Sequence, residues 1–196
     1  RLTLETGAGD RLLAMRRSPP TVDSGEGVGG LTLDVEATLL RLAVANGIPG
    51  PTVRYVLQTD DGLGSGFMMD WLEGETLGQR INRSEQLSEV RPLLARDCGR
   101  ILGRIHALPW REAKLDEALP VVDPATLVDE TWEIYRALDS PVPMLDFTRA
   151  WLLDNLPADS RRTLVHGDFR NGNLMISPAG IEAVLDWELA HIGDPV

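Results

Sequence analysis

The feature that most constrains this chain is a polar turn set between short apolar runs near its C-terminal end. Residues 163–176 read Thr-Leu-Val-His-Gly-Asp-Phe-Arg-Asn-Gly-Asn-Leu-Met-Ile, and residues 181–186 read Ile-Glu-Ala-Val-Leu-Asp. Short apolar runs bounded by Gly, Asn and Pro predict three strands joined by turns. Such turns would carry Asp168, Asn173 and Asp186 at strand ends, and loops held by a rigid scaffold often bear catalytic groups.

The order of these three side chains indicates phosphoryl transfer. A carboxylate can orient and deprotonate an attacking hydroxyl, which makes Asp168 the candidate catalytic base. An amide oxygen and a second carboxylate can hold the Mg²⁺ that neutralises nucleotide phosphates, so Asn173 and Asp186 are the candidate metal ligands. A polar turn and a strand-end cap would explain each residue singly, but not the three in this order.

The two motifs resemble the aminoglycoside phosphotransferase and choline kinase-like family, a branch of the protein-kinase-like fold. His166, Asp168 and Asn173 fill the family's H-x-D-x-x-x-x-N motif, and Asp186 stands where its magnesium-binding aspartate stands. The run Asp-Trp-Glu-Leu-Ala-His-Ile-Gly-Asp-Pro is most similar to the branch fused to, or encoded near, acyl-CoA dehydrogenases. The resemblance implies ATP and Mg²⁺ as cofactors, a small-molecule hydroxyl as acceptor, and His166 as a structural support of the catalytic loop.

The fold class expected from this resemblance is α+β. We expect a protein-kinase-like two-lobe fold, with a small antiparallel-sheet N-lobe and a mainly helical C-lobe, truncated at both ends. Residues 1–69 would form an incomplete, nucleotide-binding N-lobe and residues 70–75 the hinge. Residues 76–196 would form the C-lobe, which carries the catalytic and metal-binding loops and is incomplete at its C-terminus.

Hydrophobic periodicity and turn residues predict the elements of the N-lobe. They are strands at 2–5 and 12–15 around a turn at 7–10, a loop at 21–30, a helix at 34–46 begun by Thr32 or Asp34, and strands at 53–58 and 67–71. The glycines of the loop do not match a phosphate-binding loop, because no Lys-Ser/Thr follows them.

Four residues of this region are candidates for nucleotide binding. By resemblance, Arg16 takes the place of the family's ATP-positioning cation and Glu36 that of its partner glutamate, with Arg17 as the alternative if the register is shifted by one. Arginine offers a bidentate fork to phosphate or carboxylate. In the hinge, the backbone carbonyl of Asp70 and the backbone N–H of Leu72 would meet the adenine edge.

The C-lobe is predicted to contain four helices. They are a short helix from 77 capped by Thr76, and helices at 89–108, 124–138 and 143–155. We expect Leu145, Trp151, Leu152 and Leu156 to face inward. Trp132 and Tyr135 fit a core position better than a substrate platform.

Composition bounds the cellular context. The 196 residues carry a net charge of −11, which disfavours nucleic-acid binding because that requires clustered Lys and Arg. The single cysteine, Cys98, excludes an internal disulfide and fits a reducing compartment, with packing as its expected role. No apolar run approaches a membrane span and no signal peptide is found, so we expect a cytoplasmic protein without membrane contact. The oligomeric state stays open.

Three classes of function fit the sequence. The favoured one is an ATP- and Mg-dependent phosphotransferase that moves the γ-phosphate to a hydroxyl of a hydroxyacyl compound, an aminoglycoside or another amino alcohol. A nucleotide-binding pseudokinase module is an alternative, although the complete set of three catalytic and metal-binding side chains argues against it. A metal-dependent hydrolase is the other alternative, built from metal-competent side chains at His166, Asp168, Asp186, Glu188, His191 and Asp194.

Overall fold

The fold was obtained as a computed structural model that describes residues 1–5, 9–18, 30–158 and 160–195. The expected loop at 21–30 lies almost wholly outside these residues, and so does half of the turn at 7–10. The chain divides into two compact units. One unit comprises residues 1–108 and 166–190, and the other comprises residues 109–165 and 191–196. The predicted boundaries of N-lobe, hinge and C-lobe stay a prediction.

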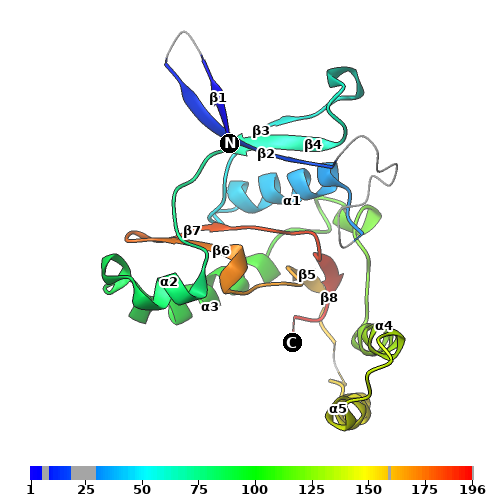
Figure 1. The fold of residues 1–196 in the computed structure, drawn as a ribbon. Helices are drawn as coiled ribbons and strands as arrows, with labels where there is room; N and C mark the ends of the chain where they lie inside the picture. Colours follow the sequence, from blue (N-terminus) through cyan, green and yellow to red (C-terminus); the bar gives the residue numbers. More distant parts are fainter. Residues whose placement is uncertain (6–8, 19–29, 159, 196) are drawn as a thin grey trace. The chain divides into compact units, whose positions relative to one another are not determined.

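The first unit contains a four-stranded antiparallel sheet in the order β1-β2-β4-β3 (Figure 1). Its strands are β1 (Leu2–Leu4), β2 (Arg11–Arg17), β3 (Val53–Val56) and β4 (Gly66–Asp70). All four were predicted, with ends that differ by one or two residues. The register of β2 on β4 pairs Arg16 with Phe67, which is completely buried. This pairing anchors the end of β2 that carries the candidate cation.

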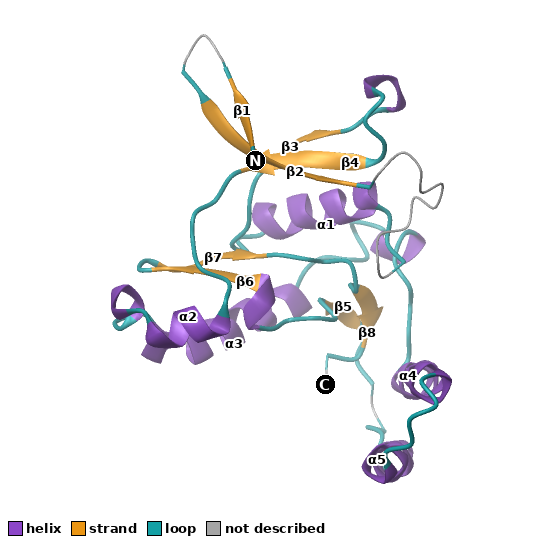
Figure 2. Ribbon diagram, viewed as in Figure 1, coloured by secondary structure: helices purple, strands orange, loops and turns teal. Residues whose placement is uncertain are grey.

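Helix α1 (Leu33–Ala45) packs against β3 and β4 (Figure 2). Its buried apolar side chains include Ala37, Leu39 and Leu40, and a fully buried leucine contributes about 1.5–3 kcal/mol relative to an exposed one. Thr32 is the N-cap residue, although its side chain makes no capping hydrogen bond. The helix buries one carboxylate, Glu36, on the same face as its apolar residues.

A β-hairpin of β6 (Leu174–Ser177) and β7 (Gly180–Val184) completes the first unit, together with α2 (Gly78–Arg83) and α3 (Leu94–His106). The N–H of Val184 donates to the carbonyl of Pro49 at 2.9 Å, which ties the hairpin to the segment after α1. Helix α3 packs on β7. The hairpin confirms two of the three predicted strands around the polar turn.

Two helix predictions are corrected. The helix predicted at 89–108 begins only at Leu94, because 3-10 turns at 85–87 and 91–93 precede it. Thr76 does not cap the helix that follows it, because Leu77 occupies the N-cap position. The Glu75 carboxylate instead accepts the backbone N–H groups of Thr76 and Leu77, at 3.0 and 2.9 Å.

The second unit contains the two antiparallel strands β5 (Thr163–Val165) and β8 (His191–Gly193) and the helices α4 (Pro124–Ala137) and α5 (Pro143–Asp154). As predicted, α4 begins at Pro124; the carboxylate of its N-cap residue, Asp123, accepts the N–H of Thr126 at 3.0 Å. Strand β8 was not predicted. In the described ranges, no helix combines the length and apolarity needed to cross a membrane.

Helix α5 contradicts the prediction of its inward face. Leu145, Trp151 and Leu152 are 45%, 54% and 37% exposed. The helix packs on α4, and a two-helix pair covers only one face of each member. Trp132 and Tyr135 are half-buried in the groove between the two helices rather than placed in a closed core.

Candidate active site

The polar turn after β5 is shaped by a glycine. Gly167 has a φ of +82°, in the left-handed region that favours glycine. A Cβ at this position would also overlap the carbonyl of Leu189. The backbone therefore passes close to Leu189 at Gly167, directly before the segment that carries Asp168 and Asn173.

Asp168 and Asn173 are brought together directly. The side-chain N–H₂ of Asn173 donates to the Asp168 Oδ2 at 2.7 Å and to the Asp168 backbone carbonyl at 2.9 Å. Asn173 is buried, and its backbone carbonyl accepts the N–H of Leu185 at 2.8 Å. Through these side-chain and backbone hydrogen bonds, Asn173 links Asp168 to Leu185, the residue that precedes Asp186.

His166 is held by backbone groups on both sides of its ring. Its Nε2 lies 3.1 Å from the carbonyl of Leu185, so that nitrogen carries the proton, and its Nδ1 accepts the N–H of Asp168 at 3.3 Å. The ring is 1% exposed and contacts Trp187 at a centroid distance of 4.7 Å. Burial lowers the pKa of His166. A neutral ring with both nitrogens occupied braces the loop.

Arg16 lies at the centre of three carboxylates. Its Nε contacts Glu36 at 3.0 Å, its Nη1 contacts Asp186 at 2.7 Å, and its Nη2 contacts Glu188 at 2.9 Å. Burial alone would lower the pKa of Arg16, but the three carboxylates outweigh it and raise that pKa. Arg17 points elsewhere and donates to the carbonyl of Leu63 at 3.2 Å.

Glu36 is the most deeply placed of these carboxylates. Burial raises its pKa to about 7, although Arg16 and the backbone N–H of Trp187 favour the charged form. Asp186 and Glu188 add to the rise by repulsion. One cation is thus shared by three acidic groups, and Glu36, the buried one, has a raised pKa.

Asp186 has an unusual backbone. Its φ of +65° is left-handed, one of three such non-glycine residues in the described chain. Aspartate tolerates this region better than most residues, at a cost of about 1–2 kcal/mol. Strain of this kind often accompanies functional positions.

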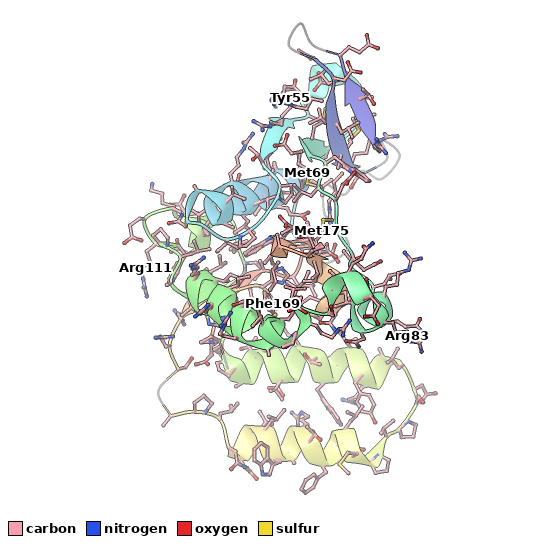
Figure 3. The ribbon with its side chains drawn as sticks, turned by 90° about the vertical axis from the view of Figure 1, so that its left-hand side faces the viewer. Tyr55, Met69, Arg83, Arg111, Phe169 and Met175 are labelled. Carbon is pink, nitrogen blue, oxygen red and sulfur yellow. The ribbon has the colours of Figure 1, made fainter. Side chains whose placement is uncertain are left out.

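Two adjoining cavities lie beside these groups. The smaller, of about 240 Å³, is lined by Arg16, Glu36, Asn173 and Asp186 among others, and the larger, of about 440 Å³, by residues 69–74 and Met175. Met69 and Leu185 line both cavities, so the two adjoin. Figure 3 shows Met69 on β4 above Met175 on β6. The smaller cavity is called the polar end here because the charged side chains of Arg16, Glu36 and Asp186 line it.

The two candidate hinge residues line the larger cavity. The Asp70 carboxylate is turned to Arg54, which donates from Nε and Nη2 at 2.8 and 2.6 Å and lowers the pKa of Asp70. Within the described ranges, the backbone N–H of Leu72 has no backbone hydrogen-bond partner. A backbone donor is therefore available at the cavity wall.

The donor set at the polar end fits Mg²⁺. Asn173 gives its N–H₂ to Asp168, so its Oδ1 is turned away from that carboxylate, and it lines the same cavity as Asp186. Mg²⁺ takes hard oxygen ligands and commonly only one or two from protein, the rest coming from phosphates and water. No cluster of three or more His, Cys, Asp or Glu suited to a metal occurs among the described residues.

The sequence reasoning missed two site residues. Glu188 entered only the hydrolase alternative, yet it holds Arg16. Arg170 was not considered, and its Nε contacts both carboxylate oxygens of Asp168 at 3.0 Å. The available signal was their spacing, since each charge lies two positions after a predicted site aspartate.

The family model described as "Phosphotransferase enzyme family" matches residues 5–196. The chain belongs to this family. It is 31% identical over 196 residues to mouse acyl-CoA dehydrogenase family member 10, a match that covers 95% of the chain and 18% of that protein. Mouse acyl-CoA dehydrogenase family member 11 is 36% identical over 100 residues, covering 48% of the chain and 13% of that protein.

Solved structures of similar fold confirm the protein-kinase-like α+β fold. A Ralstonia eutropha protein assigned as an aminoglycoside phosphotransferase aligns with a TM-score of 0.76, 21% identity, and coverage of 98% of this chain and 56% of that one. Macrolide 2'-phosphotransferase MphH from Brachybacterium faecium aligns with a TM-score of 0.64, 21% identity, and coverage of 98% and 63%. The chain therefore spans little more than half of these enzymes and a smaller part of the mouse relatives.

Proposed function

We propose that this phosphotransferase-family chain transfers the γ-phosphate of ATP to a hydroxyl of a small molecule, with Mg²⁺. The observation that carries the proposal is the convergence of Arg16, Asn173 and Asp186 on one cavity, with Asp168 hydrogen-bonded to Asn173. Relatives of the same fold support the nucleotide, since one was solved as a complex of streptomycin, ATP and APH(2")-IIa.

In the proposed binding mode, the larger cavity takes the adenine and the smaller one the phosphates. The backbone N–H of Leu72 and the carbonyl of Asp70 would pair with the adenine edge. Arg16, held by Glu36, would turn its fork to the phosphates, a group that its geometry suits. Asn173 and Asp186 would hold Mg²⁺, which supplies charge neutralisation on the phosphates when it is bound.

In the proposed reaction, the acceptor oxygen forms a bond to the γ-phosphorus. The bond from that phosphorus to the β–γ bridging oxygen breaks, and its electron pair leaves on ADP. Asp168 orients the acceptor hydroxyl and takes its proton, which is later released to solvent. Asn173 fixes the rotamer of Asp168 through the 2.7 Å hydrogen bond. His166 holds the turn by accepting the backbone N–H of Asp168 at its Nδ1.

The acceptor class is part of the proposal. A hydroxyacyl compound is suggested by similarity to the acyl-CoA dehydrogenase family members, and an aminoglycoside or other amino alcohol by the solved relatives. The hydrolase alternative stays a prediction from the sequence. The pseudokinase alternative differs from the proposal in one measurable respect, the absence of transfer. The cytoplasmic location and the absence of nucleic-acid binding stay predictions from the sequence.

Two variants of the full chain test the proposal. Asp168→Asn keeps the shape of the side chain but cannot take a proton, so ADP release in an acceptor screen should fall by about 10²–10⁴. Its affinity for ATP with Mg²⁺, measured by isothermal titration, should stay within about twofold of the original. Asp186→Asn should instead remove the Mg²⁺ dependence of ATP binding.

The exposed Asp34 on α1 provides the control, because Asp34→Asn removes the same charge away from the cavities. Unchanged Mg²⁺-dependent affinity in Asp186→Asn would contradict the metal assignment. ATP binding without transfer to any hydroxyl compound would favour the pseudokinase module over an enzyme.

A further inference from the structure

We infer that Arg170 selects an acceptor that carries an anionic group, a carboxylate or a phosphate, close to the hydroxyl that is phosphorylated. The inference rests on the proposed function, which places the acceptor hydroxyl at Asp168. It narrows the acceptor to one charge class, and it separates hydroxy acids and phosphates from amino alcohols.

Arg170 stands beside the candidate base. Its Nε bridges both carboxylate oxygens of Asp168 at 3.0 Å, while the side chain remains 63% exposed. The Asp168 Oδ2 also accepts the Asn173 amide, so Oδ1 retains the larger free hydrogen-bonding capacity. An acceptor hydroxyl that reaches Oδ1 therefore lies next to a guanidinium.

The outer edge of this guanidinium is available. Arginine has five N–H donors, and the Asp168 contact uses only the one on Nε. Among the described residues, the four N–H groups on Nη1 and Nη2 have no hydrogen-bond partner. A planar, exposed pair of donors matches a carboxylate or phosphate in bidentate geometry.

The position of the guanidinium is built into the turn. A Cβ on Gly172 would lie 2.5 Å from the Arg170 Nη1. Gly172 does not have a positive φ, so its backbone conformation does not require glycine. The missing side chain makes room for the guanidinium.

Arg170 serves the acceptor side rather than the nucleotide. The cavity lined by Arg16, Asn173 and Asp186 includes neither Arg170 nor Asp168 in its wall. Gly172, which lies beside the guanidinium, is part of that wall. Arg16 is the cation of the cavity itself, and Arg170 is paired with Asp168, where the proposed function places the acceptor hydroxyl. In a chain of net charge −11, an anionic acceptor needs such a local cation, whereas a cationic acceptor would be repelled by it.

The experiment compares matched acceptors with the full chain, ATP and Mg²⁺, following ADP release. The carboxylate arm uses 4-hydroxybutyrate, its neutral amide and 4-aminobutan-1-ol, and the phosphate arm uses glycerol 3-phosphate and glycerol. We expect kcat/KM for the anionic member of at least one arm to exceed that of its neutral partner by about tenfold, the effect of one charge-assisted contact. The arm that shows the preference identifies the anion.

Variants assign the preference to Arg170. Arg170→Gln should lower kcat/KM for the anionic acceptor by about tenfold more than for its neutral partner, which removes the preference. Arg170→Lys should retain part of the preference, because lysine keeps the charge but not the planar pair of donors. Gly172→Ala, which displaces the guanidinium without removing its charge, should also weaken it. Arg83→Gln, at an exposed arginine on α2, is the control.

Equal loss of kcat/KM for charged and neutral acceptors in Arg170→Gln would overturn the inference, because it would indicate an action on Asp168 or on the transferred group. A preference of the original chain for neutral or cationic acceptors would overturn it too, with the proposed function intact. Transfer to none of the five compounds would count against both, and failure of ATP and Mg²⁺ to bind would then identify the proposed function as the faulty step.

Discussion

At the scale of single residues, the candidate site is organised by one guanidinium and its three carboxylates. Arg16 contacts Glu36, Asp186 and Glu188 at 2.7–3.0 Å, so two negative charges remain uncompensated when all three acids are ionised. Protonation of Glu36 reduces this excess negative charge, since its raised pKa of about 7 lets it take up a proton near neutrality. Both the stability of the fold and nucleotide binding should respond to this balance.

The first prediction concerns pH. Glu36 binds a proton in the folded chain up to about pH 7, but only up to its ordinary value of 4.5 when unfolded. Its contribution to stability is thus full below about pH 4.5 and is lost as the pH rises through 7. The unfolding free energy of the original chain should therefore fall between pH 5 and 8. In Glu36→Gln this fall should be smaller by up to roughly 3 kcal/mol. Urea unfolding at several pH values measures this, and identical pH profiles would contradict it.

The second prediction concerns Glu188, which contacts Arg16 and, in the proposed binding mode, would compete with nucleotide phosphates for it. Glu188→Gln should strengthen the binding of ATP without Mg²⁺ by roughly two- to fivefold, the usual effect of a partly exposed ion pair. Isothermal titration in the presence of a chelator measures the affinity. The opposite result, weaker binding seen only with Mg²⁺, would make Glu188 a metal ligand instead.

At the scale of elements, the hairpin β6–β7 and the polar turn before it were predicted well because glycine, asparagine and proline mark their ends. Strand β8 was missed, since its three residues become a strand only by pairing with β5. The start of α3 was misplaced because the 3-10 turns before it share the same apolar periodicity. Sequence patterns therefore predict an element well when turn residues mark its ends. They fail for an element that forms only by pairing with a strand far away in the sequence.

The third prediction concerns the turn that holds the candidate base. Gly167 and Gly47 have nearly equal φ values, +82° and +78°, but only the Cβ added at 167 would meet other atoms. Gly47→Ala should cost about 1–2 kcal/mol of stability through backbone strain. Gly167→Ala should cost roughly 1–3 kcal/mol more, through overlap with Leu189. Equal losses in urea unfolding would show that the turn opens without penalty.

At the scale of the whole molecule, the burial of the elements is uneven. Helix α1 has six buried residues, whereas α4 and α5 have none in the described structure. The sequence could not reveal this, because α5 carries apolar residues such as Trp151 that read as a core face. The motif residues Asp168, Asn173 and Asp186 were assigned from spacing, but their neighbours Arg170 and Glu188 depend on how each turn directs its side chains.

The fourth prediction follows from this unevenness. Amides in α4 and α5 should exchange with solvent at least about tenfold faster than those in α1, because few buried contacts oppose local opening. Hydrogen–deuterium exchange followed by mass spectrometry measures each helix separately. Equal protection of the three helices would mean that α4 and α5 are stabilised by contacts beyond those described here.

The left-handed backbone of Asp186 limits which replacements this position can accept. Asparagine and glycine fit the same φ, while alanine and the branched residues would add strain to the loss of the carboxylate. A descendant that abandoned catalysis could therefore change this residue to asparagine with little harm to its folding. Such a protein would keep both cavities and the scaffold around them. Under the proposed function, only a lost response to divalent ions would reveal the change.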